Sequence, residues 1–411
     1  MRRSLITSLF LCLAASGRCA ADPISLEAIP ERVRAANPSL AAARWAVAEA
    51  EARALGAGRR SNPELELEAL PALRGGEFSL GIGISQAFPV TDRLRLEKEV
   101  SQSEVAEARA EVADAERRLI ADACEAAVKW LAADQLAGLR RQQAENAEAL
   151  AEFAQKRADR GEGSALDAAQ FRLEAAQFAY EIQRTEAEKA PLAGALRTLL
   201  GIAPGEPVAI SGSLAAPDSA KALADPQARP DYQAAAQRIE SADRAAALER
   251  ARRYDDITVG AGIEIERAED APEGFETEGF LGLRVSIPLP LWNKNEGGIK
   301  EAEARAARAR AEASALAAEI RGESAAARDE MAAQAKLAGN ASAELLGLAR
   351  AQVEKSEAAY RSGLADLTDT LRARDQLLAI ETGRLEALRE YHLARVRYEA
   401  ATAQHTPNSS K

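Results

Sequence analysis

The sequence predicts a mainly helical chain that also contributes strands to a membrane, because three patterns occur together. Two stretches of roughly seventy residues read as very long helices, and four shorter stretches alternate apolar with small or polar side chains. The alternating stretches run about ten residues, the length that a tilted strand needs to cross a bilayer. The third pattern is repetition, since the whole arrangement occurs twice. The expected fold class is therefore mainly α with membrane β.

The first residues have the form of an export signal. Arg2 and Arg3 precede an apolar run over 5–15, and the small residues of 19–21 suit cleavage. The run is too short to cross a bilayer as a helix. Lipidation of Cys19 is the alternative, but the arginine before it makes a poor lipidation site. We expect a signal peptide over 1–21.

Composition excludes several classes of protein. Acidic residues outnumber basic ones by 64 to 53, which argues against a nucleic-acid partner. After the signal only Cys124 remains, so no intrachain disulfide is possible. No later segment reaches eighteen consecutive apolar residues, so no transmembrane helix is expected. Aromatic residues make up 4% of the chain, which favours close-packed helices with small alanine contacts.

The chain carries its pattern twice. A helix opens at Asn37-Pro38 and its counterpart at Arg229-Pro230, and the run 157-RADRGEGSALD-167 matches 359-AYRSGLADLTD-369. A repeat of this size indicates duplicated architecture. We expect a signal peptide over 1–21, a first repeat over 22–201, a linker over 202–228, a second repeat over 229–404 and a flexible tail over 405–411.

The two long helices are expected without interruption over about 92–159 and 295–361, each roughly 100 Å long at 1.5 Å per residue. Apolar residues recur every seven positions at Val105, Val112 and Leu119, which favours coiled-coil packing. Two shorter helices in each repeat could lie end to end beside one long helix. They are expected over 31–60 and 164–201, and over 229–253 and 364–404.

The expected strands cover 64–70, 77–88, 256–266 and 280–290, with a longer loop near 271–278. In the second strand Phe78, Leu80, Ile82 and Ile84 alternate with Ser79, Gly81, Gly83 and Ser85. The apolar set is expected to face lipid and the small set a lumen. The same alternation places Leu281, Leu283, Val285, Ile287 and Leu289 on the lipid face.

Four strands cannot close a barrel whose edges face lipid, so several copies must contribute. Three copies would supply twelve strands around a water-filled lumen. A soluble β-sandwich is the alternative, but strands bracketed by such helices have no second sheet to pack on.

Together these features resemble the TolC family of outer-membrane channel-tunnels. The resemblance covers essentially the whole mature chain and rests on the order of its elements, on 62-NPEL-65 leading into a strand, and on the glycine turns. The run 286-SIPLPLWNKNEGGI-299 is similar to the branch that works with CzcCBA-type heavy-metal efflux pumps. The resemblance implies a homotrimer in the cell outer membrane. A twelve-stranded β-barrel would lie among outer-membrane lipid, and long coiled-coil hairpins would form a periplasmic α-barrel.

The implied function is a passive efflux conduit, most simply for heavy-metal cations. Its implied partners are a periplasmic adaptor (membrane fusion) protein and an inner-membrane RND-type pump. Drug efflux and type I protein secretion are alternative cargoes, because the pump selects what passes. A periplasmic coiled-coil adaptor is a further alternative, but it would carry one hairpin and not two bilayer-length strand pairs.

The glycine turns mark a candidate contact surface. A helix does not pass easily through 161-GEG-163 or 362-SGL-364, and Ser164 and Asp366 can cap the returning helices. We expect these turns to form the periplasmic tip and to face the adaptor or pump. A plain helical hairpin is the alternative. The candidate contact residues are Gly161, Gly163, Ser164, Tyr360, Gly363 and Asp366.

The resemblance places the tunnel aperture just past the second turn, where the best-known family member has an acidic pair three residues apart. The matching residues here are Asp369 and Arg372. A ring of Asp369 side chains in a trimer would attract cations. Asp369 could instead pair with Arg372 of the same or a neighbouring chain, or both could be ordinary solvated charges.

We find no catalytic constellation, so the chain is not expected to be an enzyme. The only histidines, His392 and His405, have no Cys or His partner at metal-ligand spacing. No Walker-type glycine loop is present. No cofactor or resident metal is expected.

Overall fold

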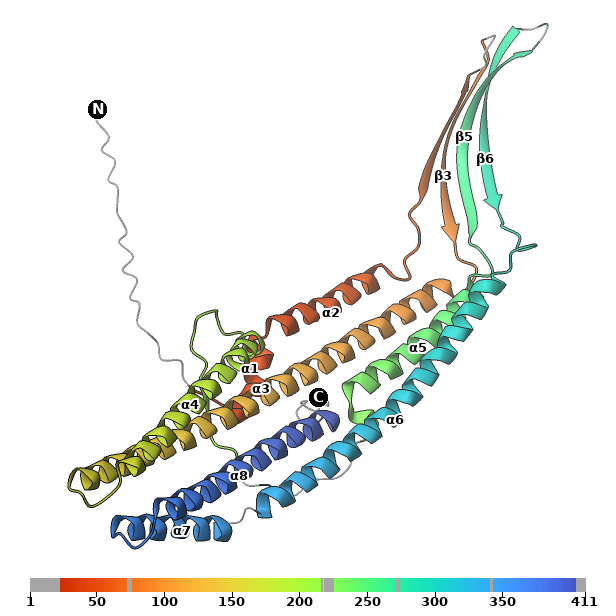
Figure 1. The fold of residues 1–411 in the computed structure, drawn as a ribbon. Coiled ribbons are helices and arrows are strands. Elements are labelled where there is room, and N and C mark those ends of the chain that lie inside the picture. The colour runs from red at the N-terminus through yellow and green to blue at the C-terminus, as the bar shows by residue number, and fades with distance from the viewer. Residues whose placement is uncertain are drawn as a thin grey trace, which may run out of the picture.

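The computed structural model describes residues 23–403 except 72–75, 216, 218–224, 271, 273 and 341–342. The expected signal peptide and the expected tail lie outside the described residues. Long helices form a layer that meets a four-stranded sheet at one end and finishes in two helical hairpin tips at the other (Figure 1). The mainly helical fold class with antiparallel strands is therefore confirmed.

The first half of the chain runs from two short helices through a β-hairpin into a long helical hairpin. Its elements are α1 (Ile29–Ala36), α2 (Pro38–Gly56), β2 (Glu64–Pro71), β3 (Phe78–Phe88), α3 (Arg93–Asp159) and α4 (Ala165–Leu200). Pro38 is the first residue of α2, and the Asn37 side chain caps this helix by accepting a 2.9 Å hydrogen bond from the Leu40 N–H.

The second half has the same order of elements. They are α5 (Pro230–Ala251), β5 (Ile257–Asp270), β6 (Gly274–Ser286), α6 (Glu296–Asn340), α7 (Ala343–Arg361) and α8 (Leu367–Ala401). Between the halves, β4 (Ile210–Ser211) pairs in parallel with β1 (Ile24–Ser25). The 3-10 turn η2 (Pro226–Ala228) then leads into α5, while η1 (Leu26–Ala28) precedes α1.

Two expectations about the second half were wrong. The helix expected over 295–361 is two helices, α6 and α7, whose axes point in different directions in Figure 1. The last two residues of α6 are Gly339 and Asn340, which both have low helix propensity. The hairpin also extends further than expected, since Asp270 pairs with Gly274 where a longer loop near 271–278 was expected. At its other end β6 stops at Ser286, because Pro288 has no N–H with which to continue a ladder.

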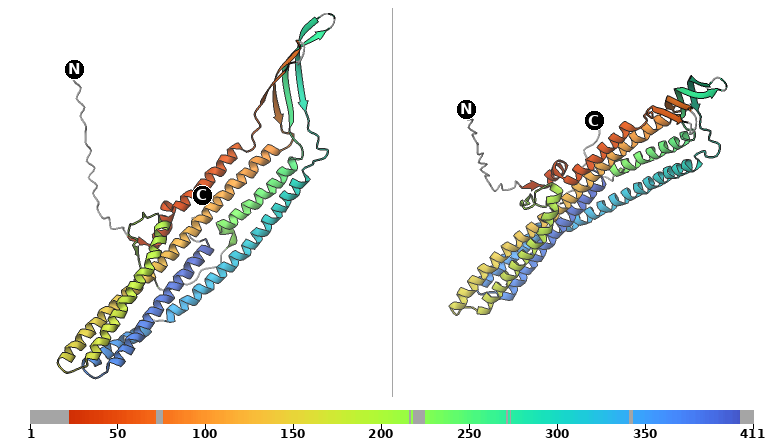
Figure 2. Two further views of the ribbon diagram at one scale, coloured as in Figure 1. Left: turned by 45° about the horizontal axis from the view of Figure 1, so that its top comes forward. Right: turned by 90° about the horizontal axis from the view of Figure 1, so that it is seen from above.

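The helices form one layer with two open edges. α2 and α4 both lie along α3, while α5 and α8 lie between α3 and the second-half helices α6 and α7 (Figures 1 and 2). Near the sheet the order is therefore α2, α3, α5, α6, and near the tips it is α4, α3, α8, α7. The edge helices are α2 and α4 on one side, and α6 and α7 on the other.

Small side chains make many of the helix contacts, and larger ones gather in separate clusters. The main cluster packs Ile29, Val33, Ile120, Val128, Leu131, Leu196 and Leu200 among alanines of α3. A second cluster, near the tips, surrounds Phe171 and Tyr360. None of the helices in the described ranges is long and apolar enough to cross a membrane.

The sheet is antiparallel throughout, in the order β2-β3-β5-β6. β3 joins the two hairpins through a long pairing with β5, from Phe78 opposite Arg267 to Phe88 opposite Ile257. The hydrogen-bonding edges of β2 and β6 have no neighbouring strand within the described chain. These strand edges lie on the same two sides as the edge helices (Figure 1).

Candidate conduit surfaces: the strand face and the hairpin tips

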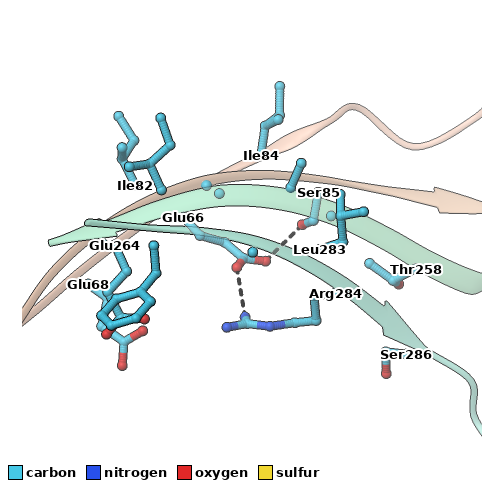
Figure 3. Close-up of a pocket in the computed structure, with 18 residues that line it drawn as sticks. Glu66, Glu68, Ile82, Ile84, Ser85, Thr258, Glu264, Leu283, Arg284 and Ser286 are labelled. Atoms are coloured by element: carbon cyan, nitrogen blue, oxygen red, sulfur yellow. Dashed lines mark hydrogen bonds and ion pairs between the residues drawn. The ribbon is translucent and has the colours of Figure 1, made fainter. Parts of the chain in front are cut away.

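The sheet presents one apolar face and one polar face. The apolar outer face is widely exposed, with Leu281 at 82% and Leu283 at 84% of their full accessibility. Leu67, Leu80, Ile82, Ile84 and Ile263 lie on the same face by register. Figure 3 shows Ile82 and Ile84 on one side of the sheet, and Glu66, Glu68, Arg284 and Ser286 on the other. The alternation expected from the sequence is therefore present in the pairing as far as Ser286, whereas Ile287 and Leu289 lie beyond the end of β6.

Glycines line the middle of the inner face. They are Gly81, Gly83, Gly260, Gly262 and Gly282. The backbone approach is close there, because a Cβ on Gly262 would lie 2.9 Å from the Ile82 carbonyl oxygen and 3.1 Å from Gly83 Cα. The glycines thus permit the curvature of the sheet, and they leave space above the backbone for long side chains from the edge strands.

Glu66 uses that space to connect the two edge strands. One of its carboxylate oxygens accepts a 2.8 Å hydrogen bond from the Ser85 hydroxyl, and the other lies 3.0 Å from Arg284 Nη1 (Figure 3). The ion pair spans from β2 to β6 above the glycines. On β3, the Ser79 hydroxyl donates to the Glu264 carboxylate. The polar network therefore lies entirely on the inner face.

The inner face is strongly acidic. Its register positions hold seven glutamates, against Arg284 as the single basic residue on this face of the described strands. The glutamates are Glu64, Glu66, Glu68, Glu264, Glu266, Glu276 and Glu278. A surface of this charge raises the local concentration of cations.

The two glycine turns adopt the backbone expected of helix ends. Gly161 has φ of 75° and Gly363 has φ of 77°, in the left-handed region that favours glycine. The Ser164 hydroxyl accepts a 3.1 Å hydrogen bond from Leu166 N–H, and the Asp366 carboxylate accepts a 2.9 Å bond from Asp369 N–H. Gly163 packs closely on α3, where a Cβ would lie 3.3 Å from Arg157 Cβ.

Tyr360 connects the second tip to the first. Its hydroxyl donates a 2.9 Å hydrogen bond to the Asp167 carboxylate, and its ring packs edge-on against Phe153 and Phe171. The side chain is 4% exposed. Burial and the bond to Asp167 raise the pKa of Tyr360 to about 12. Arg157 adds a second link by donating to the Tyr360 carbonyl at 3.2 Å.

The sequence indicated Tyr360 but missed its partners. Asp167 was visible only as the repeat counterpart of Asp369, and that equivalence did not indicate a bond to the other half. Ala158 lies opposite Tyr360 in the repeat, so only one of the two aspartates meets a tyrosine. The remaining partners, Arg157 and Phe171, gave no signal beyond helix periodicity.

The two candidate aperture residues lie together on the first turns of α8. Arg372 Nη1 is 3.7 Å from Asp369 Oδ1, and both side chains are more than half exposed. Within one chain this is an exposed pair three residues apart, of a kind that contributes little to stability.

A buried ion pair that the sequence did not indicate joins three helices above the tips. Arg374 of α8 is 3% exposed and lies 3.5 Å from the Glu174 carboxylate of α4. It also donates to the Gln143 carbonyl of α3 at 3.2 Å. Arg374 Nη1 and Glu174 Oε2 remain without a hydrogen-bond partner among the described residues. Burial raises the pKa of Glu174, although Arg374 opposes this shift.

No group of three or more potential metal ligands is assembled in the part of the chain that the structure describes. His392 is buried, and its Nε2 lies 3.0 Å from the Ala215 carbonyl oxygen. Burial lowers the pKa of His392. His405 lies outside the described residues.

A sheet with an apolar outer face and an acidic inner face, joined to long helical hairpins, defines a channel type of membrane protein. The chain belongs to the outer membrane efflux protein family, whose sequence model matches residues 29–201 and 226–404. No curated protein sequence matches the chain.

Solved outer-membrane channels share this architecture. CusC is 18% identical, and the alignment covers 92% of this chain and 91% of CusC with a TM-score of 0.73. VceC of Vibrio cholerae is 20% identical over 92% of this chain and 95% of VceC, with a TM-score of 0.71. The CmeC outer membrane channel of Campylobacter jejuni is 14% identical over 94% of this chain and 87% of CmeC, with a TM-score of 0.73. At these identities the likeness establishes the fold.

Proposed function

We propose that three copies of this chain form a channel-tunnel that passively conducts heavy-metal cations out of the cell. The strands would close a twelve-stranded barrel in the outer membrane, and the helices would extend as a tunnel into the periplasm. An inner-membrane RND-type pump would supply the cargo through a periplasmic adaptor protein.

The unpaired edges of β2 and β6 carry the assembly part of this proposal. The outer face beside them exposes Leu67, Leu281 and Leu283, which suits lipid and not water. Open strand edges in lipid would leave backbone groups without partners, at a cost of several kcal/mol each. Pairing β6 of one copy with β2 of the next removes both edges, and three copies give an even number of strands around a lumen.

The acidic inner face favours cations as cargo. In a closed barrel the inner face becomes the lumen wall, and three copies would present it three times around one axis. Rings of carboxylates favour cation passage and disfavour anions. The Glu66–Arg284 ion pair neutralises only one of the seven glutamates on this face in each chain.

The hairpin tips are the proposed contact surface for the adaptor or pump. Leu364, in the second turn, is 86% exposed, although turns in water are usually polar. Gly161, Gly163, Ser164, Gly363 and Asp366 lie in or beside the two turns, where a partner can reach them. Tyr360 is buried, so we propose that it positions the second tip and does not contact the partner itself.

The test is a deletion strain profiled against divalent metal salts, small organic toxicants and protein export. We expect loss of metal resistance, which the parent gene restores. A variant with Glu264→Gln and Glu266→Gln should restore less, because the lumen loses negative charge. Sensitivity to organic compounds alone would overturn the cation assignment and favour drug efflux, whereas loss of protein export alone would favour secretion.

A further inference from the structure

The apolar outer face of the sheet has the height of a membrane barrel. By register, its positions on β3 and β5 run from Phe78, opposite Arg267, to Phe88, opposite Ile257. At about 3.3 Å per residue this length is roughly 33 Å, which gives about 25 Å along the membrane normal for a strand tilted by about 40°. The outward apolar band of a membrane barrel is also about 25 Å tall. For an outer face that spans the bilayer, Phe88 and Ile257 therefore lie at the level of the lipid headgroups.

Basic and aromatic side chains follow the outer face at this end of the sheet. They lie in three of the connections between helices and strands, and all of them are exposed. We call these residues the basic-aromatic belt. They are Arg59 and Arg60 before β2, Arg253 and Tyr254 before β5, and Trp292 and Lys294 after β6.

The four cations of the belt form no ion pair with any described residue. Arginines close to them in sequence or in space are paired, since Arg93 lies 2.6 Å from Asp256 and Arg252 lies 2.8 Å from Glu249. In the three connections, all of which the structure describes, Asp255 is the one carboxylate without an ion pair. Free cations therefore outnumber free carboxylates at this level, in a chain whose formal net charge is -11. Such a local excess attracts anions.

Arg60 is held against the outer face. Its guanidinium carbon lies 5.8 Å from the centre of the Phe88 ring. The Gln86 side chain fixes the same connection by donating a 2.9 Å hydrogen bond to the Ser61 carbonyl, and both Gln86 and Phe88 are outer-face positions by register. The Arg60 N–H groups have no hydrogen-bond acceptor among the described residues. A guanidinium in this state can bind two phosphate oxygens through parallel N–H groups.

The connection from β6 to α6 is apolar although it is open to solvent. Pro288 and Pro290 have no N–H with which to join a ladder. Leu289, Leu291 and Trp292 are 68%, 61% and 93% exposed. The connection projects beyond the ends of β6 and α6 (Figures 1 and 2). Tryptophan is enriched at membrane–water interfaces, because its ring is apolar while its N–H needs a polar partner.

We propose that the basic-aromatic belt binds anionic phospholipid headgroups in the periplasmic leaflet of the outer membrane. The three arginines and Lys294 bind the phosphodiester groups, while Trp292 enters the boundary between headgroups and acyl chains. This inference rests on the membrane conduit proposed above and adds a class of lipid to its partners. Two observations favour lipid: the belt is continuous with the apolar outer face, and its free cations complement an anionic surface.

A second copy of the chain is the competing occupant of the connection from β6 to α6, because β6 is an edge strand. A protein surface there would cover Trp292 and keep lipid away from it. Arg253 distinguishes the two occupants. It precedes β5, which pairs with β3 on one side and β6 on the other, so Arg253 lies away from both edges of the sheet. A neighbouring copy would leave this cation free, whereas a lipid surface reaches it.

Fluorescence quenching by brominated lipids measures whether Trp292 contacts lipid. Full-length protein with Trp45→Phe and Trp130→Phe keeps Trp292 as its single tryptophan. It is reconstituted in phosphatidylcholine vesicles whose acyl chains carry bromine either near the headgroup or near the chain end. We expect stronger quenching by the bromine near the headgroup. The matched control keeps only Trp45, which is 75% exposed on α2, roughly 16 Å from the end of that helix, and should not be quenched.

Each other outcome of the quenching experiment has a distinct meaning. An unquenched Trp292 in vesicles where the chain forms pores would overturn the proposal, because the ring would then be covered by protein. Equal quenching of Trp45 and Trp292 would overturn the level assigned to the belt. A chain that neither inserts nor forms pores would count against the conduit, and against the belt with it.

Native mass spectrometry tests the class of lipid. The detergent-solubilised parent, mixed with equal amounts of phosphatidylglycerol and phosphatidylethanolamine, should retain phosphatidylglycerol preferentially. Arg60→Gln with Arg253→Gln should lower that retention about fivefold, the factor that one cation contributes near an anionic surface.

The matched control is Arg308→Gln with Arg321→Gln, because both arginines are exposed on α6 at roughly 18 Å or more from its first residue. This control should retain as much phosphatidylglycerol as the parent. Equal retention by the two double variants would overturn the role of the belt cations. Metal resistance that survives in such a case would leave the conduit standing.

Discussion

The Tyr360 hydroxyl of α7 donates a 2.9 Å hydrogen bond to the Asp167 carboxylate of α4, and so ties the two hairpin tips of one chain together. The bond is shielded, because Tyr360 is 4% exposed and its ring packs against Phe153 and Phe171. If the tips must separate for the proposed tunnel to open, this bond is among the contacts that opening breaks.

Tyr360→Phe should loosen the tips. The ring and its packing remain, but a buried hydrogen bond worth about 1 kcal/mol is lost and Asp167 loses its partner. We expect a higher single-channel conductance in planar bilayers. Asp167→Asn should have a smaller effect, because its amide oxygen can still accept the bond. Tyr254→Phe is the control, since Tyr254 is 49% exposed and lies away from the tips. Equal conductance of the Tyr360 and Tyr254 variants would argue that the bond between Tyr360 and Asp167 does not hold the tips together.

The same bond should tolerate alkaline pH. The pKa of Tyr360 is raised from 10.0 to about 12, chiefly by burial and next by Asp167. A raised pKa means that folding favours the protonated hydroxyl, so the stabilisation is complete below pH 10 and is lost as the pH rises through about 12. Tyrosinate absorbance is titrated against pH for the parent and for Tyr360→Phe, and the difference between the two curves gives the titration of Tyr360 alone. A midpoint near pH 10 would show that Tyr360 is neither buried nor bonded as described.

Much of the fold is predictable from the sequence because it depends on periodicity. Alternation defined the strands, and the seven-residue recurrence at Val105 and Val112 indicated helix packing. The ends of elements were less predictable: α6 ends at Asn340 where the apolar pattern alone continues one helix, and register pairing extends β5 to Asp270.

The contacts at the candidate site were harder to predict, since they join residues distant in sequence. Asp167 and Tyr360 are separated by 193 positions, and Glu66 and Arg284 by 218. The sequence around each of these residues contains no pattern that would predict its distant partner. The buried Arg374 looked like any helix arginine, and only the packing of α8 on α3 and α4 shows that it is enclosed.

Gly262→Ala should destabilise the sheet. The added methyl group would lie 2.9 Å from the Ile82 carbonyl oxygen, and neither backbone can move without disturbing the ladder. Strain of this kind costs about 1–3 kcal/mol. Gly279→Ala on β6 is the control, because nothing lies within 4 Å of its Cβ position. The urea concentration at the midpoint of unfolding is measured for both variants of the detergent-solubilised protein. Equal midpoints would mean that the sheet can flatten without loss of stability.

Leu283→Arg and Ser286→Arg should differ in membrane assembly. Leu283 lies on the outer face at 84% exposure, whereas Ser286 is on the inner face beside Thr258. An arginine facing lipid near the bilayer midplane costs about 2–4 kcal/mol, whereas one in a lumen remains hydrated. The fraction of each variant recovered in the outer membrane measures the effect. Equal recovery would show that the two faces are not lipid and lumen.

Arg372→Ala tests whether the exposed pair with Asp369 matters at the aperture. Within one chain the pair is 3.7 Å apart and solvated, so its loss should leave folding stability almost unchanged. In a trimer, however, the substitution would leave three carboxylates near one axis without their arginines, and their mutual repulsion should loosen the tip. We expect Arg372→Ala to raise single-channel conductance. Adding Asp369→Ala should reduce the preference for cations, measured from the reversal potential in a salt gradient.

Arg384→Ala is the control, because Arg384 lies on an exposed part of α8 further from the tip. If the conductance and selectivity of both aperture variants match those of this control, Asp369 and Arg372 are ordinary surface charges and the aperture lies elsewhere.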